Sequence, residues 1–278
     1  MTPLDRTDKW IARLDESART YLSESEHRAY AAIPAAERSK QVQALLEKPI
    51  THFSAVIDVL FRARWAEVLQ AAGAQPSLTL LEIASGDTDV IPQMMARDYP
   101  GSRYVAANMN QLLTAGLRAK TAGLPLDVLV IEEDAIGIAR HLAADSVDVI
   151  AFQHGVNDVL QAILCDKEGV DTIQTDWMET LPKMIEIMQR ETRANTLEQH
   201  VKPEFLALLA TLLTVVKPGG LMAMNHYMFQ LDLDWGYPPA VWEHLIPIVR
   251  DWVKGVPGLQ EVSFAGFDPQ WWLFLKKA

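Results

Sequence analysis

The residues with the clearest chemical meaning form a short turn after an apolar run. Glu82 lies at the end of that run, and the small residues Ala84, Ser85 and Gly86 follow it before a helix-like segment begins. Small side chains at a strand-to-helix turn let a ligand approach the backbone, and the amides that open the next helix can bind polar groups. The dinucleotide pattern G-x-G-x-x-G is absent, because Ala84 and Thr88 stand where glycines are expected. The turn predicts a ligand cradle, and the missing glycines weaken a nicotinamide-binding interpretation.

A second candidate segment, 153–158, follows the apolar run 147–152. His154 could remove a proton from a hydroxyl or an amine, because the ordinary pKa of histidine lies close to neutral. Asp158 could orient His154 or bind a polar substrate. The structural alternatives are a histidine that only hydrogen-bonds its loop and an aspartate that only caps a helix. We favour a catalytic His154 because of its position at the carboxyl end of a predicted strand.

Aromatic and histidine side chains elsewhere could line an acceptor pocket. His226 and Tyr227 follow a later apolar run, and Trp235 lies in the loop after them. The amino-terminal segment contributes Tyr21, Tyr30, His52 and Phe53. The alternative for these side chains is ordinary core packing, which is the commoner fate of a tryptophan.

The elements that must position these residues change character near residue 74. Apolar residues recur at helical spacing over 1–73, with Pro34 and Pro49 as the main breaks, which predicts a helical cap. Short apolar runs then alternate with helical stretches over 74–278 and predict strands at 78–83, 104–107, 126–131, 147–152 and 221–227. Nearly continuous apolar strands need burial on both faces. We therefore expect an α/β fold with a doubly wound, mostly parallel sheet.

The carboxyl-terminal part completes the predicted sheet. A helix is expected over 240–253, followed by strands at 260–264 and 271–276 that are joined by the turn signal 266–269. These last two strands should pair antiparallel, which gives seven strands in all. The helix-rich insertion 160–200 has two interpretations of equal weight, a solvated helical elaboration with an apolar inner face or a lid over a substrate.

Five segments, taken in order, resemble the motifs of class I S-adenosylmethionine-dependent methyltransferases. They are 82–86, 104–108, 133–135, 146–154 and 216–220, and the resemblance covers about 200 residues from Leu78 to the end of the chain. It implies a Rossmann-like fold. It also implies that the cofactor-binding residues are Glu82, Ala84, Ser85, Gly86, Asn108, Met109, Asp134, Ala135 and Gln153.

The resemblance also implies a role for the main members of this set. Glu82, Ala84 and Gly86 would shape the cradle for the amino-acid portion of the donor. Asn108 would hydrogen-bond the ribose where the family has an acidic residue, and Asp134 would bind the adenine amino group. Gln153 stands where metal-dependent catechol-type members have an aspartate, and it is a poor ligand, so no metal is expected.

Composition sets the remaining expectations. The 278 residues are 49% apolar and 22% charged, which is typical of a globular protein and excludes disordered, collagen-like and disulfide-rich classes. The formal charge of −11 argues against nucleic acid as a partner. The single Cys165 and the lack of a signal-like or membrane-spanning apolar stretch predict a cytoplasmic protein. The expected partner is a small-molecule substrate, and a homodimer is left open.

Together these observations favour an S-adenosylmethionine-dependent methyltransferase that methylates oxygen or nitrogen, rather than carbon, of a small molecule and releases S-adenosylhomocysteine. His154 and Asp158 are its candidate catalytic residues, and Tyr21, Tyr30, His226, Tyr227 and Trp235 its candidate substrate-binding residues. The departures at Ala84, Thr88 and Asn108 keep a second hypothesis open, a catalytically silent binding protein for the same cofactor. A nicotinamide-dependent oxidoreductase is the third.

Overall fold

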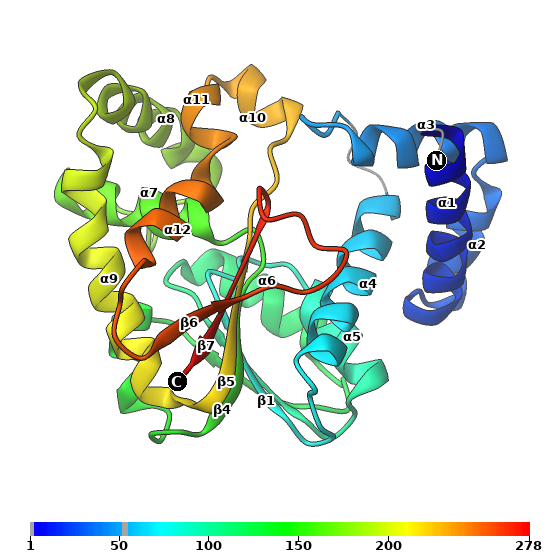
Figure 1. Ribbon diagram of the computed structural model, residues 1–278, viewed down its shortest axis with the longest axis horizontal. Coiled ribbons are helices and arrows are strands. Elements are labelled where there is room, and N and C mark those ends of the chain that lie inside the picture. The colour runs from blue at the N-terminus through cyan, green and yellow to red at the C-terminus, as the bar shows by residue number, and fades with distance from the viewer. Residues whose placement is uncertain (1–2, 52–54) are drawn as a thin grey trace.

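The central element of the protein, seen in a computed structural model that describes residues 3–51 and 55–278, is a seven-stranded sheet (Figure 1). Its strands are β1 (Thr79–Ile83), β2 (Arg103–Ala107), β3 (Asp127–Ile131), β4 (Val147–Phe152), β5 (Val216–Asn225), β6 (Leu259–Val262) and β7 (Trp272–Lys277). Their order is β3-β2-β1-β4-β5-β7-β6; β7 pairs antiparallel with both β5 and β6, and the other neighbouring strands pair parallel. The predicted doubly wound sheet with an antiparallel last pair is confirmed.

Helices cover both faces of this sheet, as its apolar strands require. Figure 1 shows α4 and α5 on one side and α9 and α12 on the other. The helices are α1 (Pro3–Tyr21), α2 (Glu24–Ala32), α3 (Ala35–Leu46), α4 (Ala55–Ala71), α5 (Val90–Asp98), α6 (Gln111–Thr121), the 3₁₀ helix η1 (Ala135–Arg140), α7 (Val156–Lys167), α8 (Trp177–Ala194), α9 (Leu197–Val215), α10 (Gln230–Trp235), α11 (Pro239–Trp242) and α12 (Leu245–Val253). In the part of the chain that the structure describes, no helix is both long and apolar enough to cross a membrane.

Two predicted boundaries were wrong. The fifth strand begins at Val216 rather than Leu221. Val147 on β4 pairs with Val216, and Val149, two residues later, pairs with Leu221, five residues later on β5. The extra residues of β5 form a bulge where the sequence predicted a turn. Gly219 in this bulge has a φ of +73°, which a glycine accommodates without strain. The single helix expected over 240–253 is two helices, and Pro247 falls in the first turn of α12, where its missing N–H costs no hydrogen bond.

The amino-terminal helices pack together and against α4. Ser23 separates α1 from α2 and caps α2 with a reciprocal bond pair to Glu26, and Pro34 precedes α3. After α3 the backbone of Ile50 pairs with the loop that follows β5, since Ile50 N–H donates to the Met228 carbonyl at 2.8 Å. The helical cap is therefore tied to the carboxyl ends of the strands.

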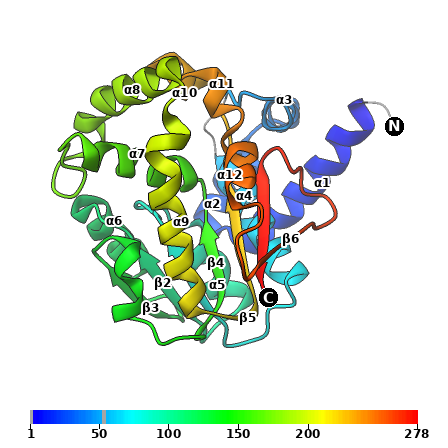
Figure 2. The ribbon, with the colours of Figure 1, turned by 60° about the vertical axis from the view of Figure 1, so that its left-hand side comes forward.

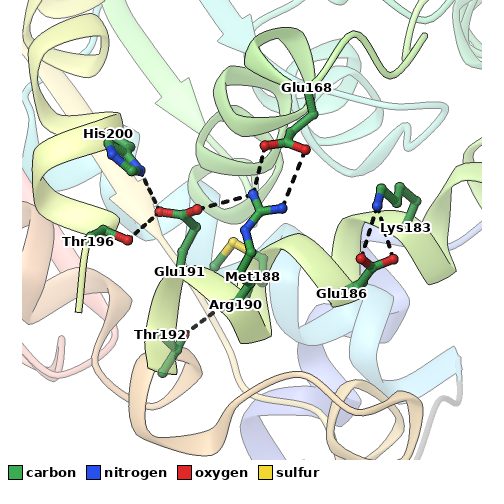
Figure 3. Close-up of polar contacts among 9 residues, drawn as sticks. All are labelled: Glu168, Lys183, Glu186, Met188, Arg190, Glu191, Thr192, Thr196 and His200. Carbon is green, nitrogen blue, oxygen red and sulfur yellow. Dashed lines mark hydrogen bonds and ion pairs between the residues drawn. The ribbon is translucent and has the colours of Figure 1, made fainter. Parts of the chain in front are cut away.

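The insertion folds as the end of α7, the loop 168–176, α8 and the start of α9. α8 buries an apolar face that includes Met184 and Met188, and it lies beside α10 (Figure 2), where Gln189 Nε2 donates to the Gly236 carbonyl at 2.7 Å. Glu191 fastens the turn to α9 by accepting from Thr196 Oγ1 at 2.7 Å and pairing with His200 Nδ1 at 2.6 Å (Figure 3).

Candidate functional site

A cavity of about 760 Å³ opens at the carboxyl ends of β1, β2 and β3. This volume lies within the range of small-molecule pockets, about 300–1,000 Å³. The strand-end residues that line it are Ile83, Ala84, Gly86, Ala107, Asn108, Met109, Glu133, Asp134 and Ala135. The cavity continues along α7 and α9, with the insertion loop on its remaining side. In an open α/β sheet this edge is where ligands bind.

The turn between β1 and α5 exposes its backbone to the cavity. Ala84 has a φ of +54° and Gly86 a φ of +57°, so both occupy the left-handed region. Only glycine adopts this conformation without cost, and a non-glycine residue pays roughly 1 kcal/mol. A Cβ added to Gly86 would meet only Leu113 Cδ1, at 4.0 Å, so the space in front of this backbone is open. Ala84, which has this strained conformation, stands at a position where the sequence pattern leads us to expect a glycine.

Asn108, at the end of β2, holds this turn in place. Its Nδ2 donates to the Gly86 carbonyl at 3.1 Å, which leaves Oδ1 as an acceptor beside the cavity. A carboxylate at this position could not donate to the Gly86 carbonyl. The hydrogen bond to Gly86 therefore explains why an asparagine can stand here in place of an acidic residue. Its Oδ1 can still accept a hydrogen bond from a ligand hydroxyl.

Asp134 and Ala135 form the third side of the cradle, after β3. Asp134 caps η1, because its Oδ1 accepts from the Ile136 N–H at 2.9 Å, and its second carboxylate oxygen has no such bond to the helix. Both residues line the cavity together with Met109. Of the predicted cofactor-binding residues, six gather around the cavity, namely Ala84, Gly86, Asn108, Met109, Asp134 and Ala135.

Glu82, Ser85 and Gln153 do not line the cavity. Glu82 is fully buried and accepts from Tyr104 Oη at 2.7 Å; burial, only partly offset by this bond, raises the pKa of Glu82 to about 8. Ser85 is also buried. Gln153 Oε1 accepts from Trp65 Nε1 and from Asn225 Nδ2. Gln153 therefore joins α4 to β5, and its role toward a cofactor stays a prediction.

His154 follows β4 in a strained conformation, with a φ of +53°. Its Nδ1 accepts from the Tyr227 N–H at 3.2 Å, so the neutral ring carries its proton on Nε2. The ring stacks on His226 at 4.8 Å between centroids. Burial, followed by the nearby Lys48, lowers the pKa of His154 to about 4. His154 is absent from the cavity wall, and the lone pair that a base would need is already used.

Asp158 does line the cavity, from the first turn of α7. Its Oδ1 accepts from Asn157 Nδ2 at 2.8 Å. Burial, followed by the nearby Asp232 carboxylate, raises the pKa of Asp158 to about 7. A carboxylate with a pKa near neutral can accept a proton and return it under physiological conditions. Of the two candidate catalytic residues, Asp158 has the better placement and basicity.

The candidate substrate-binding residues lie elsewhere. Tyr21 Oη donates to Asp98 at 3.0 Å and Tyr30 Oη to Asp15 at 2.8 Å, so both hydroxyls serve the helical cap. His226 is buried, and Tyr227 Oη accepts from Trp272 Nε1 at 3.0 Å inside the core. Trp235 is 39% exposed at the end of α10. None of these five lines the cavity, and His52 and Phe53 fall outside the described residues.

Several lining residues were not predicted. The wall along α7 includes Val159, Ala162 and Ile163, and the insertion adds Thr172, Ile173 and Trp177. Asn110 holds the insertion loop to the end of β2, because its Nδ2 donates to the Thr172 and Thr175 carbonyls at 3.1 and 2.9 Å. The apolar residues at helical spacing in α7 were the available signal. Among the described residues no group of His, Cys, Asp or Glu is arranged to hold a metal.

Comparisons with known proteins found similarity in the fold and no match in the sequence. No protein-family model matches the chain, and no curated protein matches its sequence. Among solved structures, the chain is similar to the carbon methyltransferase CurJ, with 14% identity and a TM-score of 0.49 over 100% of this chain and 71% of that one. It is also similar to a SAM-dependent methyltransferase from Aquifex aeolicus, with 14% identity and a TM-score of 0.46 over 76% of this chain and 87% of that one.

Proposed function

We propose that the protein is an S-adenosylmethionine-dependent methyltransferase that acts on a small molecule. The observation that carries this proposal is the convergence of three strand ends on one cavity: a turn with two left-handed residues after β1, Asn108 after β2 and Asp134 after β3. Each position offers what one part of the donor needs. The open backbone at Gly86 suits the amino-acid portion, Asn108 Oδ1 the ribose hydroxyls and Asp134 the adenine amino group.

When bound, S-adenosylmethionine supplies an electrophilic methyl group on a sulfonium. The residues of this chain would position the donor relative to the acceptor and would accept a proton from the acceptor. The cradle would hold both ends of the donor, and such positioning supplies much of the rate acceleration in transfers between two substrates. Asp158, in the cavity wall beside the end of β4, would accept a proton from the acceptor.

Binding of the donor is tested by calorimetric titration of the full chain with S-adenosylmethionine, S-adenosylhomocysteine and reduced nicotinamide dinucleotide. We expect one site for each adenosyl-sulfur compound and none for the nicotinamide. Absence of adenosyl-ligand binding at millimolar concentration contradicts the proposal, and tight nicotinamide binding supports the oxidoreductase instead. Binding followed by no methyl transfer to any acceptor would favour the silent binding protein.

The adenine contact is tested by Asp134→Ala, which we expect to weaken S-adenosylhomocysteine binding about tenfold. One lost hydrogen bond to a charged group is worth about 1.5 kcal/mol. The matched control is Asp127→Ala, which removes an exposed carboxylate at the opposite end of β3 and should leave the affinity unchanged. Equal affinities for wild type and Asp134→Ala would remove Asp134 from the donor site.

A further inference from the structure

The wall of the cavity contains a carboxylate that has no cationic partner. Asp158 and its neighbour Asp232 each lie in surroundings that disfavour a charge, and no lysine, arginine or histidine in the described part of the chain pairs with either. Burying a charge without a partner is expensive. Carboxylates in such surroundings cluster at functional sites, where a ligand can supply the missing charge.

Asp158 accepts one side-chain hydrogen bond from the described part of the chain. Asn157 is 8% exposed and donates its Nδ2 to Asp158, but its own Oδ1 has no hydrogen-bond partner. Tyr237 Oη, which approaches from the loop after α10, donates to Gln161 rather than to the carboxylate. Asp232 accepts from the Phe229 N–H at 3.2 Å. Of these groups Asp158 lines the cavity, and its carboxylate keeps acceptor capacity for a ligand that carries N–H donors.

Charge at the cavity rim favours the same class of ligand. The exposed carboxylates Asp166, Asp171 and Glu204 line it, and Lys167 is the one cation among the described lining residues. Lys167 Nζ is paired with Glu204 Oε1 at 2.7 Å, so its charge is already balanced. An anionic acceptor would meet net repulsion on entry, whereas a cation would be attracted.

The rest of this part of the cavity is apolar. Val159 and Ile163 on α7, Leu208 on α9, and Ile173 and Trp177 from the insertion lie along it. Resting on the proposed function, we infer that the methyl acceptor is an amine with an apolar body, whose ammonium group binds at Asp158. The ammonium proton passes from nitrogen to an Asp158 carboxylate oxygen, which frees the nitrogen lone pair.

The inference is tested with two probes of equal length, n-octylamine and 1-octanol, titrated calorimetrically at pH 7.5 into the full chain with and without saturating S-adenosylhomocysteine. We expect octylamine to bind at least tenfold more tightly than octanol. Asp158→Asn should abolish this preference, whereas Asp158→Glu, which keeps the charge, should retain most of it. The matched control Asp251→Asn removes an exposed carboxylate on α12 and should change nothing.

Equal binding of the two probes, no binding of either, or an undiminished preference in Asp158→Asn would overturn the inference. Each of these outcomes is separate from failure of the proposed function, because binding of S-adenosylhomocysteine is measured in the same samples. If octanol binds more tightly and depends on Asp158, the acceptor is a hydroxyl compound and the amine assignment is wrong.

Discussion

Replacing Asp158 with asparagine is expected to make the protein more stable at pH 8.5 and to change little at pH 4. The raised pKa, about 7 against an ordinary 3.8, means that the native state holds this proton where the unfolded chain has lost it. The contribution of Asp158 to wild-type stability therefore falls as pH rises from about 4 through 7. The full shift corresponds to about 4 kcal/mol, and partial solvent access reduces the expected gain to about 2 kcal/mol.

The groups that face Asp158 support this sign. Asp232 and Tyr237 approach from the segment after β5 and Asn157 and Gln161 from α7, and none of them carries a positive charge. The measurement is urea unfolding of wild type, Asp158→Asn and the control Asp251→Asn at both pH values. A variant that keeps the wild-type pH dependence would show that Asp158 is not a desolvated carboxylate without a cationic partner. A stability gain on removal of the group would mark Asp158 as retained for function rather than folding.

Substitution of Gly155 by alanine is expected to destabilise the protein by about 3 kcal/mol and to weaken donor binding as well. A Cβ at Gly155 would lie 2.7 Å from the Ile83 carbonyl oxygen and 3.3 Å from Ala84 Cβ. Both contacts are with the end of β1 and the turn that follows it. The β4–α7 loop would therefore have to move away from this turn. Overpacking of this kind typically costs 1–3 kcal/mol.

The comparison for this variant is Gly101→Ala. Gly101 has a φ of +80° and open space around it, so alanine there should cost only about 1 kcal/mol of backbone strain and leave the cradle intact. Thermal and urea unfolding give the stabilities, and titration with S-adenosylhomocysteine gives the affinities. If Gly155→Ala behaves like Gly101→Ala, close contact between the two loops does not shape the cradle.

The fold was predictable wherever a local pattern determines it. The apolar runs of β1 and β4 needed burial on both faces, which indicated a parallel sheet, and the turn at 266–269 separates the last two strands. The start of β5 was missed because its bulge contains the same proline and glycine residues that mark a turn. Secondary structure at such positions depends on pairing with β4, which the sequence of one strand does not contain.

The candidate site was predictable in part, for a related reason. Strand ends meet at one edge of a parallel sheet, so Gly86, Asn108 and Asp134 could be placed together from the sequence. Which face a side chain near a strand end takes depends on its neighbours, and Glu82 faces Tyr104 in the core rather than the cavity. The insertion loop reaches the cavity through Asn110, a contact between segments more than 60 residues apart that no local pattern encodes.

We propose that one cavity, at the ends of the first three strands, holds an adenosine-linked sulfur compound. A crystal structure of the full chain grown with S-adenosylhomocysteine tests this proposal. We predict density for the ligand with its adenine at Asp134, its ribose at Asn108 and its amino acid along the backbone of Gly86. A ligand bound at another place, or crystals at saturating ligand with this cavity free of it, would contradict the account.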